Sequence, residues 1–432
     1  MKPIIPKLNE GKEIYKFMSD AFYINRSLSG DGTREFLRFI KKKIKKLKII
    51  EVKSGSKVFD WTVPKEWNIK NGFIKEVNGK IILDFKKNNL HVVGYSEKID
   101  KMIKFEDLKK KIHYIKKYPN AVPYITSYYK KNWGFCISYN DFKKMKKKKY
   151  HIKIDSSFKS NGSMTYGELI LKGKTKNEIL ISCNICHPSM MSNELSGPAI
   201  AAEISKILMN RDNFYTYRII FIPETIGAIA YLNKNFRIMK KRLVAGYHLT
   251  CLGIGEEFSM IDSKNKESYS SKIATNIIHS YNKKKIYSFL DRGSDERQFN
   301  SPGIDLNICT LMRSKFFEFK EYHNSMDNLK KTNSKYMQQS YNFILKILNL
   351  IENDYKIKTL VKCEPFLSKR GLYRDLNKNE KLNDLDLDII NILSYGDKLK
   401  VSEISKIINR PAETILQVCE VLKKHKLISI RR

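Results

Sequence analysis

The segment ILISCNICHPSMMSNELSGPAIAA, residues 179–202, joins an apolar stretch to a run of small residues through a polar loop. The apolar start is typical of a buried strand, and the small residues after Gly197 are typical of a closely packed helix. The loop between them carries His187, Asn193 and Glu194. In open α/β sheets, loops at the carboxyl ends of strands bring functional side chains together. The segment therefore predicts an α/β fold with an active site at this loop.

Two later segments repeat the layout. Residues 217–223, YRIIFIP, predict a buried strand that ends just before Glu224, and residues 306–312 predict another strand before His323. Imidazole nitrogen and carboxylate oxygen are the usual zinc ligands of hydrolytic sites. His187 and His323 are therefore the candidate imidazole ligands. The other histidines occur in ordinary strand, helix or lysine-rich contexts and are expected to be structural: His91, His113, His151, His248, His279 and His425.

The hydrophobic periodicity changes along the chain and divides it into parts. Strands and helices alternate in the middle of the sequence, which predicts a mainly parallel sheet covered by helices. Short strand-like runs precede this region, and three short helices with a terminal strand end the chain, as in a winged helix-turn-helix. The predicted parts are N-terminal helices packing on the α/β domain (1–48), a β-rich domain (49–154), the α/β domain (155–354), a linker (355–380) and the winged helix (381–432).

The composition is that of a globular intracellular protein. With 432 residues and 42% hydrophobic content, the chain is long enough for two or three domains with sizeable cores. No apolar run approaches the roughly 20 residues of a membrane span, and the first residues lack the apolar core of a secretory signal. The 7 Cys are odd in number and scattered, which favours reduced thiols. We therefore expect a cytoplasmic protein.

The formal net charge of +37 would attract any polyanion. The lysines, however, are spread along the whole chain, which favours a solvating role over a dedicated binding face. The third helix of the predicted winged helix has Ala412, Glu413, Thr414 and Gln417 where base-reading residues would lie. Nucleic acid is therefore a possible partner but not the expected one, and a protein contact, including a homodimer, is favoured.

Several motifs carry a family resemblance: WTVPKEW (61–67), PYITSYY with WGFC (123–136), GSMTYGEL (162–169), CHPSMMSNELSGP (186–198), PETIGAIAYL (223–232), GSDERQFNSPGI (293–304) and EYHNSMDNL (321–329). They cover nearly the whole chain and resemble a group of bacterial aminopeptidase-like proteins, often found among polysaccharide-biosynthesis proteins. The resemblance implies a zinc-exopeptidase-like α/β domain, in which a mixed sheet is sandwiched by helices. It also implies an inserted small β-rich domain, a C-terminal winged helix and Zn²⁺ as the cofactor.

In the di-zinc aminopeptidases that this domain resembles, the site consists of a first His, a bridging acid before Ser-Gly, a Glu pair, a strand-end Asp and a last His. His187, Glu224 and His323 match the first His, the Glu pair and the last His, and Asn193 or Glu194 matches the bridging acid. Three positions depart from that pattern: Ser189 replaces an orienting Asp, Thr225 stands beside Glu224, and Thr250 replaces the strand-end Asp. The loss of an anionic ligand at position 250 favours one bound ion over two.

The resemblance implies that His187, Glu194 and His323 hold the metal and that Glu224 is the general base. An exchange in which Glu224 binds the metal stays open. The cation would polarise the scissile carbonyl and lower the pKa of its water, while Glu224 moves the proton. Asp295 would orient the base or the substrate. This assignment requires the rings of His187 and His323 to lie within about 10 Å of each other.

We therefore expect a metal-dependent hydrolase of amide bonds, an aminopeptidase or amidase acting on a small peptide-like or amino-sugar substrate. An acyl or cyclising transfer stays open because it would use the same residues. The alternative is a protein of this fold without effective catalysis, which binds or assembles another macromolecule through its winged helix and basic surface.

Overall fold

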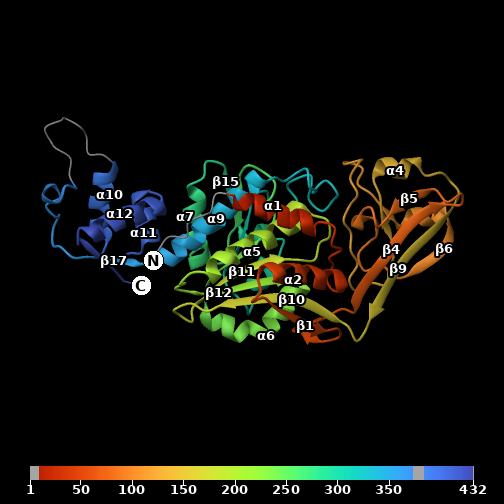
Figure 1. Cartoon of the computed structure of the whole chain (residues 1–432), viewed down its shortest axis with the longest axis horizontal. Helices are drawn as coiled ribbons and strands as arrows, with labels where there is room; N and C mark the ends of the chain where they lie inside the picture. Colours follow the sequence, from red (N-terminus) through yellow and green to blue (C-terminus); the bar gives the residue numbers. More distant parts are fainter. Residues whose placement is uncertain (1–8, 373–383, 432) are drawn as a thin grey trace.

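The computed structural model describes residues 9–372 and 384–431. Three parts follow one another along the longest axis of the protein: a β-rich domain at one end, an α/β domain in the middle and a winged helix at the other end (Figure 1). None of the helices within these two ranges is both long and apolar enough to cross a membrane.

The central domain is built on a mixed sheet. In the described residues this sheet has 8 strands in the order β1-β10-β12-β11-β13-β16-β14-β15. Its middle strands are parallel, but β1, β10 and β14 introduce antiparallel pairs, so the sheet is less uniformly parallel than alternation alone predicted. The strands are β1 (Lys48–Lys53), β10 (Ser163–Leu171), β11 (Glu178–Asn184), β12 (Thr216–Ile222), β13 (Leu243–Leu249), β14 (Phe258–Ile261), β15 (Lys284–Tyr287) and β16 (Ile308–Met312).

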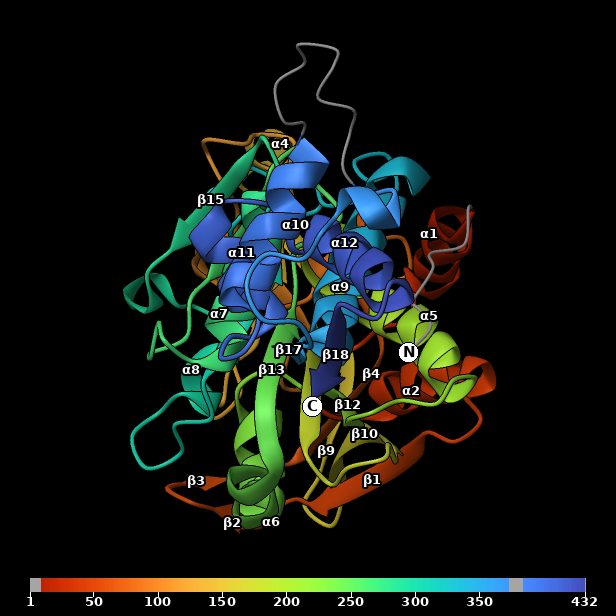
Figure 2. The same cartoon turned by 90° about the vertical axis from the view of Figure 1, so that its left-hand side faces the viewer.

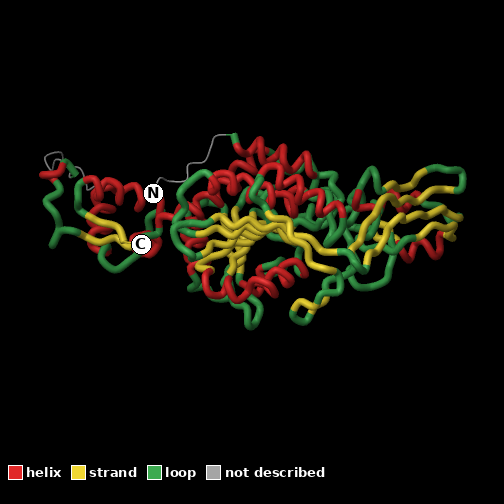
Figure 3. The backbone as a smooth tube through the Cα atoms, turned by 60° about the horizontal axis from the view of Figure 1, so that its bottom comes forward, coloured by secondary structure: helices red, strands yellow, loops and turns green. Residues whose placement is uncertain are grey.

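Helices cover both faces of this sheet (Figure 3). One face carries α1 (Glu10–Ala21), α2 (Asp31–Lys43), α5 (Ser196–Met209), α7 (Tyr269–His279) and α9 (Ser334–Asn353), and the other carries α6 (Ile226–Arg242) and α8 (Glu296–Phe299). Successive strand residues point to opposite faces. Ile179 and Ile181 therefore join the first core, and Leu180 joins the second. The predicted fold class, a mixed sheet sandwiched by helices, is confirmed.

Helix α1 closes the domain by packing on α9. The Gly11 N–H donates to the side-chain oxygen of Gln338 at 2.8 Å, a contact between residues 327 positions apart. The Tyr15 hydroxyl donates to the Leu329 carbonyl at 2.8 Å. Ile14, Phe17 and Met18 of α1 are buried in the same core as α9. The start of the described chain is thus held by its last central helix.

The β-rich domain is inserted between β1 and β10. Its main sheet has the order β5-β4-β9-β6. The elements are β4 (Glu66–Glu76), β5 (Ile81–Asp84), β6 (Ile99–Lys104), α3 (Phe105–Leu108), β7 (Ile112–His113), β8 (Phe135–Cys136), α4 (Tyr139–Lys144) and β9 (Lys149–Lys159).

The observed boundaries of this domain differ from the predicted range 49–154. Strand β1 belongs to the central sheet because it pairs with β10 along its whole length, and β9 continues to Lys159. Among the short strand-like runs of this region, residues 57–62 form a hairpin of β2 (Lys57–Val58) and β3 (Trp61–Thr62). It turns at Phe59, whose φ of 51° is incompatible with an extended strand.

The winged helix packs on α7 and α9 of the central domain (Figure 2). It consists of β17 (Lys356–Thr359), α10 (Asp384–Tyr395), α11 (Val401–Ile408), α12 (Ala412–Lys424) and β18 (Ile428–Arg431). Because β17 pairs with β18, residues 356–359 belong to the winged helix and not to the predicted linker 355–380. Residues 373–380 of that linker lie outside the described ranges.

Candidate active site

The predicted strand-end residues converge at one edge of the central sheet. His187 follows β11, and Glu224 follows β12, its parallel neighbour. His323 comes from the loop between β16 and α9 and lies beside them, with 5.0 Å between the ring centroids of His187 and His323. This separation is within the limit of about 10 Å that a shared ion allows.

Glu194 holds the ring of His187 from its Nδ1 side. Its Oε2 lies 2.7 Å from His187 Nδ1, and its Oε1 accepts the backbone N–H groups of Cys186 and His187. Burial disfavours the imidazolium, but the Glu194 carboxylate more than offsets this and raises the pKa of His187 well above its ordinary value. Glu194 therefore fixes the ring so that Nε2 points the other way.

Glu224 is the acidic group on that other side of His187. Its Oε2 lies 3.6 Å from His187 Nε2, and its Oε1 accepts the Ser294 hydroxyl at 2.9 Å. Ser294 Oγ in turn contacts Asn184 Nδ2 and His248 Nε2, each at 3.1 Å. Burial lowers the pKa of His248 to about 4, so this ring is neutral at neutral pH.

Asp295 lies behind Glu224 and is fully buried. Its Oδ1 accepts the backbone N–H of Thr225 at 2.7 Å, whereas its Oδ2 has no hydrogen-bond partner in the described part of the chain. Burial raises the pKa of Asp295 well above its ordinary value, and the nearby Glu224 raises it further. Burial also raises the pKa of Glu224. The two carboxyl groups therefore form a pair that retains a proton more readily than an isolated carboxylate.

His323 presents an unused nitrogen to the site. Its ring stacks on Tyr322 with 3.9 Å between centroids, and its buried Nε2 has no hydrogen-bond partner among residues 9–372 and 384–431. Burial and the neighbouring His187 lower the pKa of His323 well below its ordinary value. The neutral imidazole can therefore offer Nε2 to a cation.

On the Nε2 side of His187, a carboxylate oxygen lies at a distance that two ligands of one metal ion can have. Two ligand atoms bound to a tetrahedral zinc at 2.0–2.1 Å are about 3.4 Å apart. The 3.6 Å between His187 Nε2 and Glu224 Oε2 is close to that value. The 2.7 Å between His187 Nδ1 and Glu194 Oε2 is a hydrogen-bond distance that leaves no room for an ion. Glu194 therefore lies at the Nδ1 side of His187, and Glu224 is the acidic group that faces Nε2.

A group of three potential ligand atoms lies on the Nδ1 side of His187. Atoms of Cys186, His187 and Glu194 lie within 4.8 Å of one another. The Cys186 sulfur, however, accepts the backbone N–H of Glu224 at 3.3 Å. Burial raises the pKa of this thiol to about 11, so it is protonated at neutral pH. This group therefore supports the ring of His187 and the start of the Glu224 turn.

The departures from the di-zinc pattern have visible structural consequences. The Ser189 hydroxyl donates to the Phe22 carbonyl at 3.3 Å and does not orient His187, a task that Glu194 performs. The Thr250 hydroxyl donates to the Asn193 carbonyl at 2.9 Å, so an uncharged group fills the end of β13. Neither side chain therefore brings a negative charge to the site.

Two residues that contact the site are not among the candidates predicted from the sequence. Arg26, between α1 and α2, is fully buried and donates to the His187 carbonyl through Nε at 3.1 Å and Nη2 at 2.7 Å. Tyr124 comes from the β-rich domain, and its ring centroid lies 4.8 Å from that of His187 and 5.3 Å from that of His323. Both contacts join segments far apart in the chain, so no local pattern could have revealed them.

The backbone around the site is strained. Ser189, Thr225, Cys251 and His323 have φ values of 48°, 64°, 51° and 54°. The left-handed region costs a non-glycine residue about 1–2 kcal/mol. Such strain is common where a fold must aim functional side chains.

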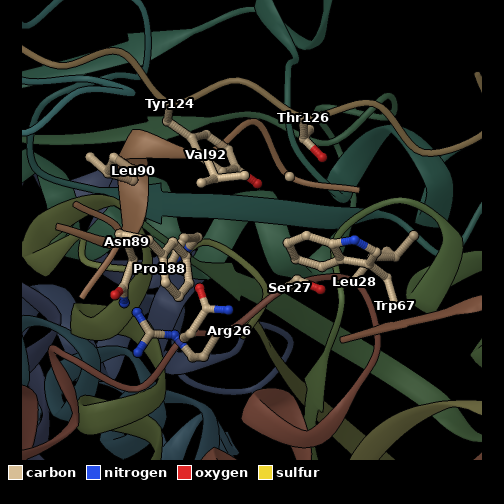
Figure 4. A pocket seen from close by; sticks show the side chains of 13 residues that line it. Arg26, Ser27, Leu28, Trp67, Asn89, Leu90, Val92, Tyr124, Thr126 and Pro188 are labelled. Atoms are coloured by element: carbon tan, nitrogen blue, oxygen red, sulfur yellow. The ribbon is translucent and has the colours of Figure 1, made fainter. Parts of the chain in front are cut away.

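A small cavity lies beside the site, between the Arg26 loop and the β-rich domain (Figure 4). Its walls include Arg26, Trp67, Tyr124, Thr126 and Pro188. Its volume of about 20 Å³ is enough for roughly one water molecule. This cavity therefore lies at the contact between two domains and is too small to be the substrate pocket.

Known structures with this fold are aminopeptidase-like. The zinc aminopeptidase BSAP from Bacillus subtilis has a TM-score of 0.60 at 13% identity, over 80% of this chain and 95% of that chain. At this identity the likeness shows the fold alone. A crystal structure of a Clostridium acetobutylicum protein, named as a peptidase, has a TM-score of 0.91 at 38% identity, over 98% of this chain and 96% of that one. Fold and domain organisation thus define an aminopeptidase-like protein.

The family follows from the sequence match. Residues 15–354 match the family described as "Domain of unknown function (DUF4910)", and residues 355–430 match a winged helix-turn-helix family. The chain belongs to the DUF4910 family. It is also 42% identical over 366 residues to a Clostridium acetobutylicum protein named as a polysaccharide biosynthesis protein with an aminopeptidase-like domain. That match covers 84% of this chain and 83% of the relative, so the predicted family resemblance is confirmed.

Proposed function

We propose that the protein is a metal-dependent hydrolase of amide bonds, an aminopeptidase or amidase with one zinc ion. Two distances carry the proposal: Glu224 Oε2 lies 3.6 Å from His187 Nε2, and the ring of His323, whose buried Nε2 has no partner in the described residues, lies 5.0 Å from that of His187 between centroids. The aminopeptidase-like fold supports it. The Clostridium relative is named as a polysaccharide biosynthesis protein. We therefore propose a peptide-like or amino-sugar precursor of a surface polysaccharide as the substrate.

In this proposal each residue has a definite task. A zinc ion held by His187 Nε2, Glu224 and His323 Nε2 would polarise the scissile carbonyl and lower the pKa of a bound water. Glu194 orients His187 through Nδ1, as carboxylates commonly do for metal-binding histidines. Asp295 fixes the Thr225 backbone beside Glu224. With Glu224 on the metal, the neighbouring Asp295 carboxyl group would accept the proton of the attacking water and return it to the leaving amine.

Elemental analysis of the purified protein tests this proposal. We expect about one zinc per chain, and loss of that zinc in His187→Ala and His323→Ala. His279→Ala, at the exposed end of α7, is the matched control and should retain the metal. Zinc-loaded protein should hydrolyse aminoacyl p-nitroanilides. The finding that purified wild-type protein contains no metal would refute the proposal.

The second candidate is a binding protein of the same fold without turnover. It is favoured by the uncharged Thr250 at the end of β13, because a weaker ligand set also weakens catalysis. Zinc binding without any hydrolysed product would support this candidate. Mass analysis of the products separates hydrolysis from a cyclising or acyl transfer, which would leave no net addition of water.

A further inference from the structure

Arg297 lies beside Glu224, whose side chain is 20% exposed. It is exposed to solvent, two residues after Asp295, and its Nη2 donates to the Thr225 hydroxyl at 2.7 Å. Thr225 directly follows Glu224, whose Oε2 faces His187. The guanidinium is therefore anchored one residue away from the acidic side chain at the centre of the proposed chemistry.

The remaining donors of this guanidinium have no protein acceptor in the described structure. Within residues 9–372 and 384–431, the Arg297 side chain forms one hydrogen bond, the one to Thr225, and it forms no ion pair with a carboxylate. A guanidinium carries five N–H donors in a planar fork that matches a carboxylate or phosphate. One N–H group of the exposed guanidinium is bound to Thr225, and the others can donate to an oxyanion from solution.

We propose that Arg297 binds an anionic group of the substrate, a carboxylate or phosphate carried by the leaving amine. The inference rests on the proposed function for the position of the scissile bond. It assigns the substrate to one chemical class: an amide whose amine portion bears an oxyanion close to the nitrogen.

The test compares three compounds that share one aminoacyl group. The first is an aminoacyl-glycine with a free carboxylate, the second is its neutral glycinamide counterpart, and the third is an aminoacyl amide of ethanolamine phosphate. Equilibrium binding and kcat/KM are measured for each with zinc-loaded protein. Wild-type protein should bind the two anionic compounds more tightly than the neutral one. The anionic compound with the higher affinity and kcat/KM identifies the preferred oxyanion.

The variants locate this preference. Arg297→Gln should reduce the ratio of anionic to neutral affinity by about 10- to 100-fold, as expected for a lost charged hydrogen bond, and Arg297→Lys should restore part of it. Arg292→Gln is the matched control, because this exposed arginine lies over the Phe289 ring at 4.9 Å. Equal ratios in wild type and Arg297→Gln, or no anionic preference in wild type, would overturn the inference. Binding preference without hydrolysis would retain the inference and reject the proposed function.

Discussion

At the scale of single residues, Glu194 performs a task that the pattern of related enzymes gives to another position. Ser189 stands where an orienting Asp is expected, and its hydroxyl is turned toward Phe22. The Glu194 carboxylate binds His187 Nδ1 instead and is also held by two backbone N–H groups. An orienting carboxylate sets the tautomer and direction of an imidazole. The site therefore keeps the ring orientation although it has lost the usual acid.

Glu194→Gln should weaken zinc binding about 10- to 100-fold, because the amide cannot stabilise His187 as a carboxylate does. Zinc affinity is measured by competition with a chromophoric chelator. Glu203→Gln is a suitable control, since Glu203 is equally buried but pairs with Lys206 on α5. Wild-type affinity in Glu194→Gln would contradict this role.

The sequence predicts some site residues better than others. His187 and Glu224 could be found because each directly follows a buried strand, and parallel strands end at the same edge. The sequence could not predict which ring nitrogen of His187 Glu194 contacts, because a spacing of seven residues allows contact with either one. Arg26 reaches the His187 carbonyl across 161 residues, a distance that no local periodicity encodes.

At the scale of elements, the β-rich domain contributes directly to the site. Its segment 122–125 pairs with the loop of His323, with the Tyr124 N–H donating to the His323 carbonyl and the Ser325 N–H to the Val122 carbonyl, each at 2.9 Å. The alternation of strands and helices predicted the central sheet. It could not place β1, because the partner strand β10 follows only after the whole inserted domain.

Tyr124→Ala should weaken zinc binding, since it leaves a void beside both imidazoles and costs about 3 kcal/mol of packing. Tyr124→Phe keeps the ring and should retain most of the affinity. Tyr139→Ala, which removes a partly buried ring elsewhere in the β-rich domain, serves as the control. Zinc titration of the three variants checks the prediction. A wild-type dissociation constant in Tyr124→Ala would show that the ring does not support the site.

A buried ion pair joins α2, β4 and β10. Arg34 contacts Glu66 at 2.6 and 2.9 Å, and the Ser163 N–H donates to Glu66 at 2.9 Å. Burial opposes the charge of Glu66, but Arg34 and Ser163 more than offset it and lower the pKa to about 2. Because the unfolded pKa is about 4.3, the pair stabilises the fold above that pH. This contribution is lost as the pH falls toward 2.

Glu66→Gln should therefore lower Tm at pH 6 and reduce the fall in Tm between pH 6 and pH 3. Thermal unfolding of wild type and variant over this range measures both effects. The control is Glu106→Gln, whose pair with Lys109 is exposed and contributes little. Parallel Tm curves for wild type and Glu66→Gln would contradict the prediction.

At the scale of the whole molecule, the winged helix packs on the central domain, and most of the net positive charge lies outside the winged helix. Glu413, at the start of α12, pairs with Lys346 of α9 at 2.9 Å, and Asn276 of α7 donates to Ser405 at 2.8 Å. Residues 381–432 contain 10 Lys and Arg against 7 Asp and Glu, a net +3. Residues 49–154 contain 25 Lys against 10 acidic residues, a net +15. Any polyanion should therefore meet the β-rich domain first.

Binding to duplex DNA should be salt-sensitive and without sequence preference. With 6–10 phosphate contacts, affinity would fall about 10³- to 10⁵-fold between 50 and 200 mM salt. Lys146→Glu with Lys147→Glu should weaken binding more than Lys423→Glu with Lys424→Glu, which changes two exposed lysines of α12. Fluorescence anisotropy at several salt concentrations measures this. Salt-resistant, sequence-selective binding that depends on α12 would contradict it.

The packing of α1 on α9 also determines when the chain can finish folding during its synthesis. Gly11 must wait for Gln338, 327 residues later, which at about 5–20 residues per second takes on the order of 20–60 s on the ribosome. During that interval the apolar face of Ile14, Phe17 and Met18 has no partner on α9. We therefore expect the nascent protein to depend on chaperones, and its first helix to be the last central element to become protected from proteases.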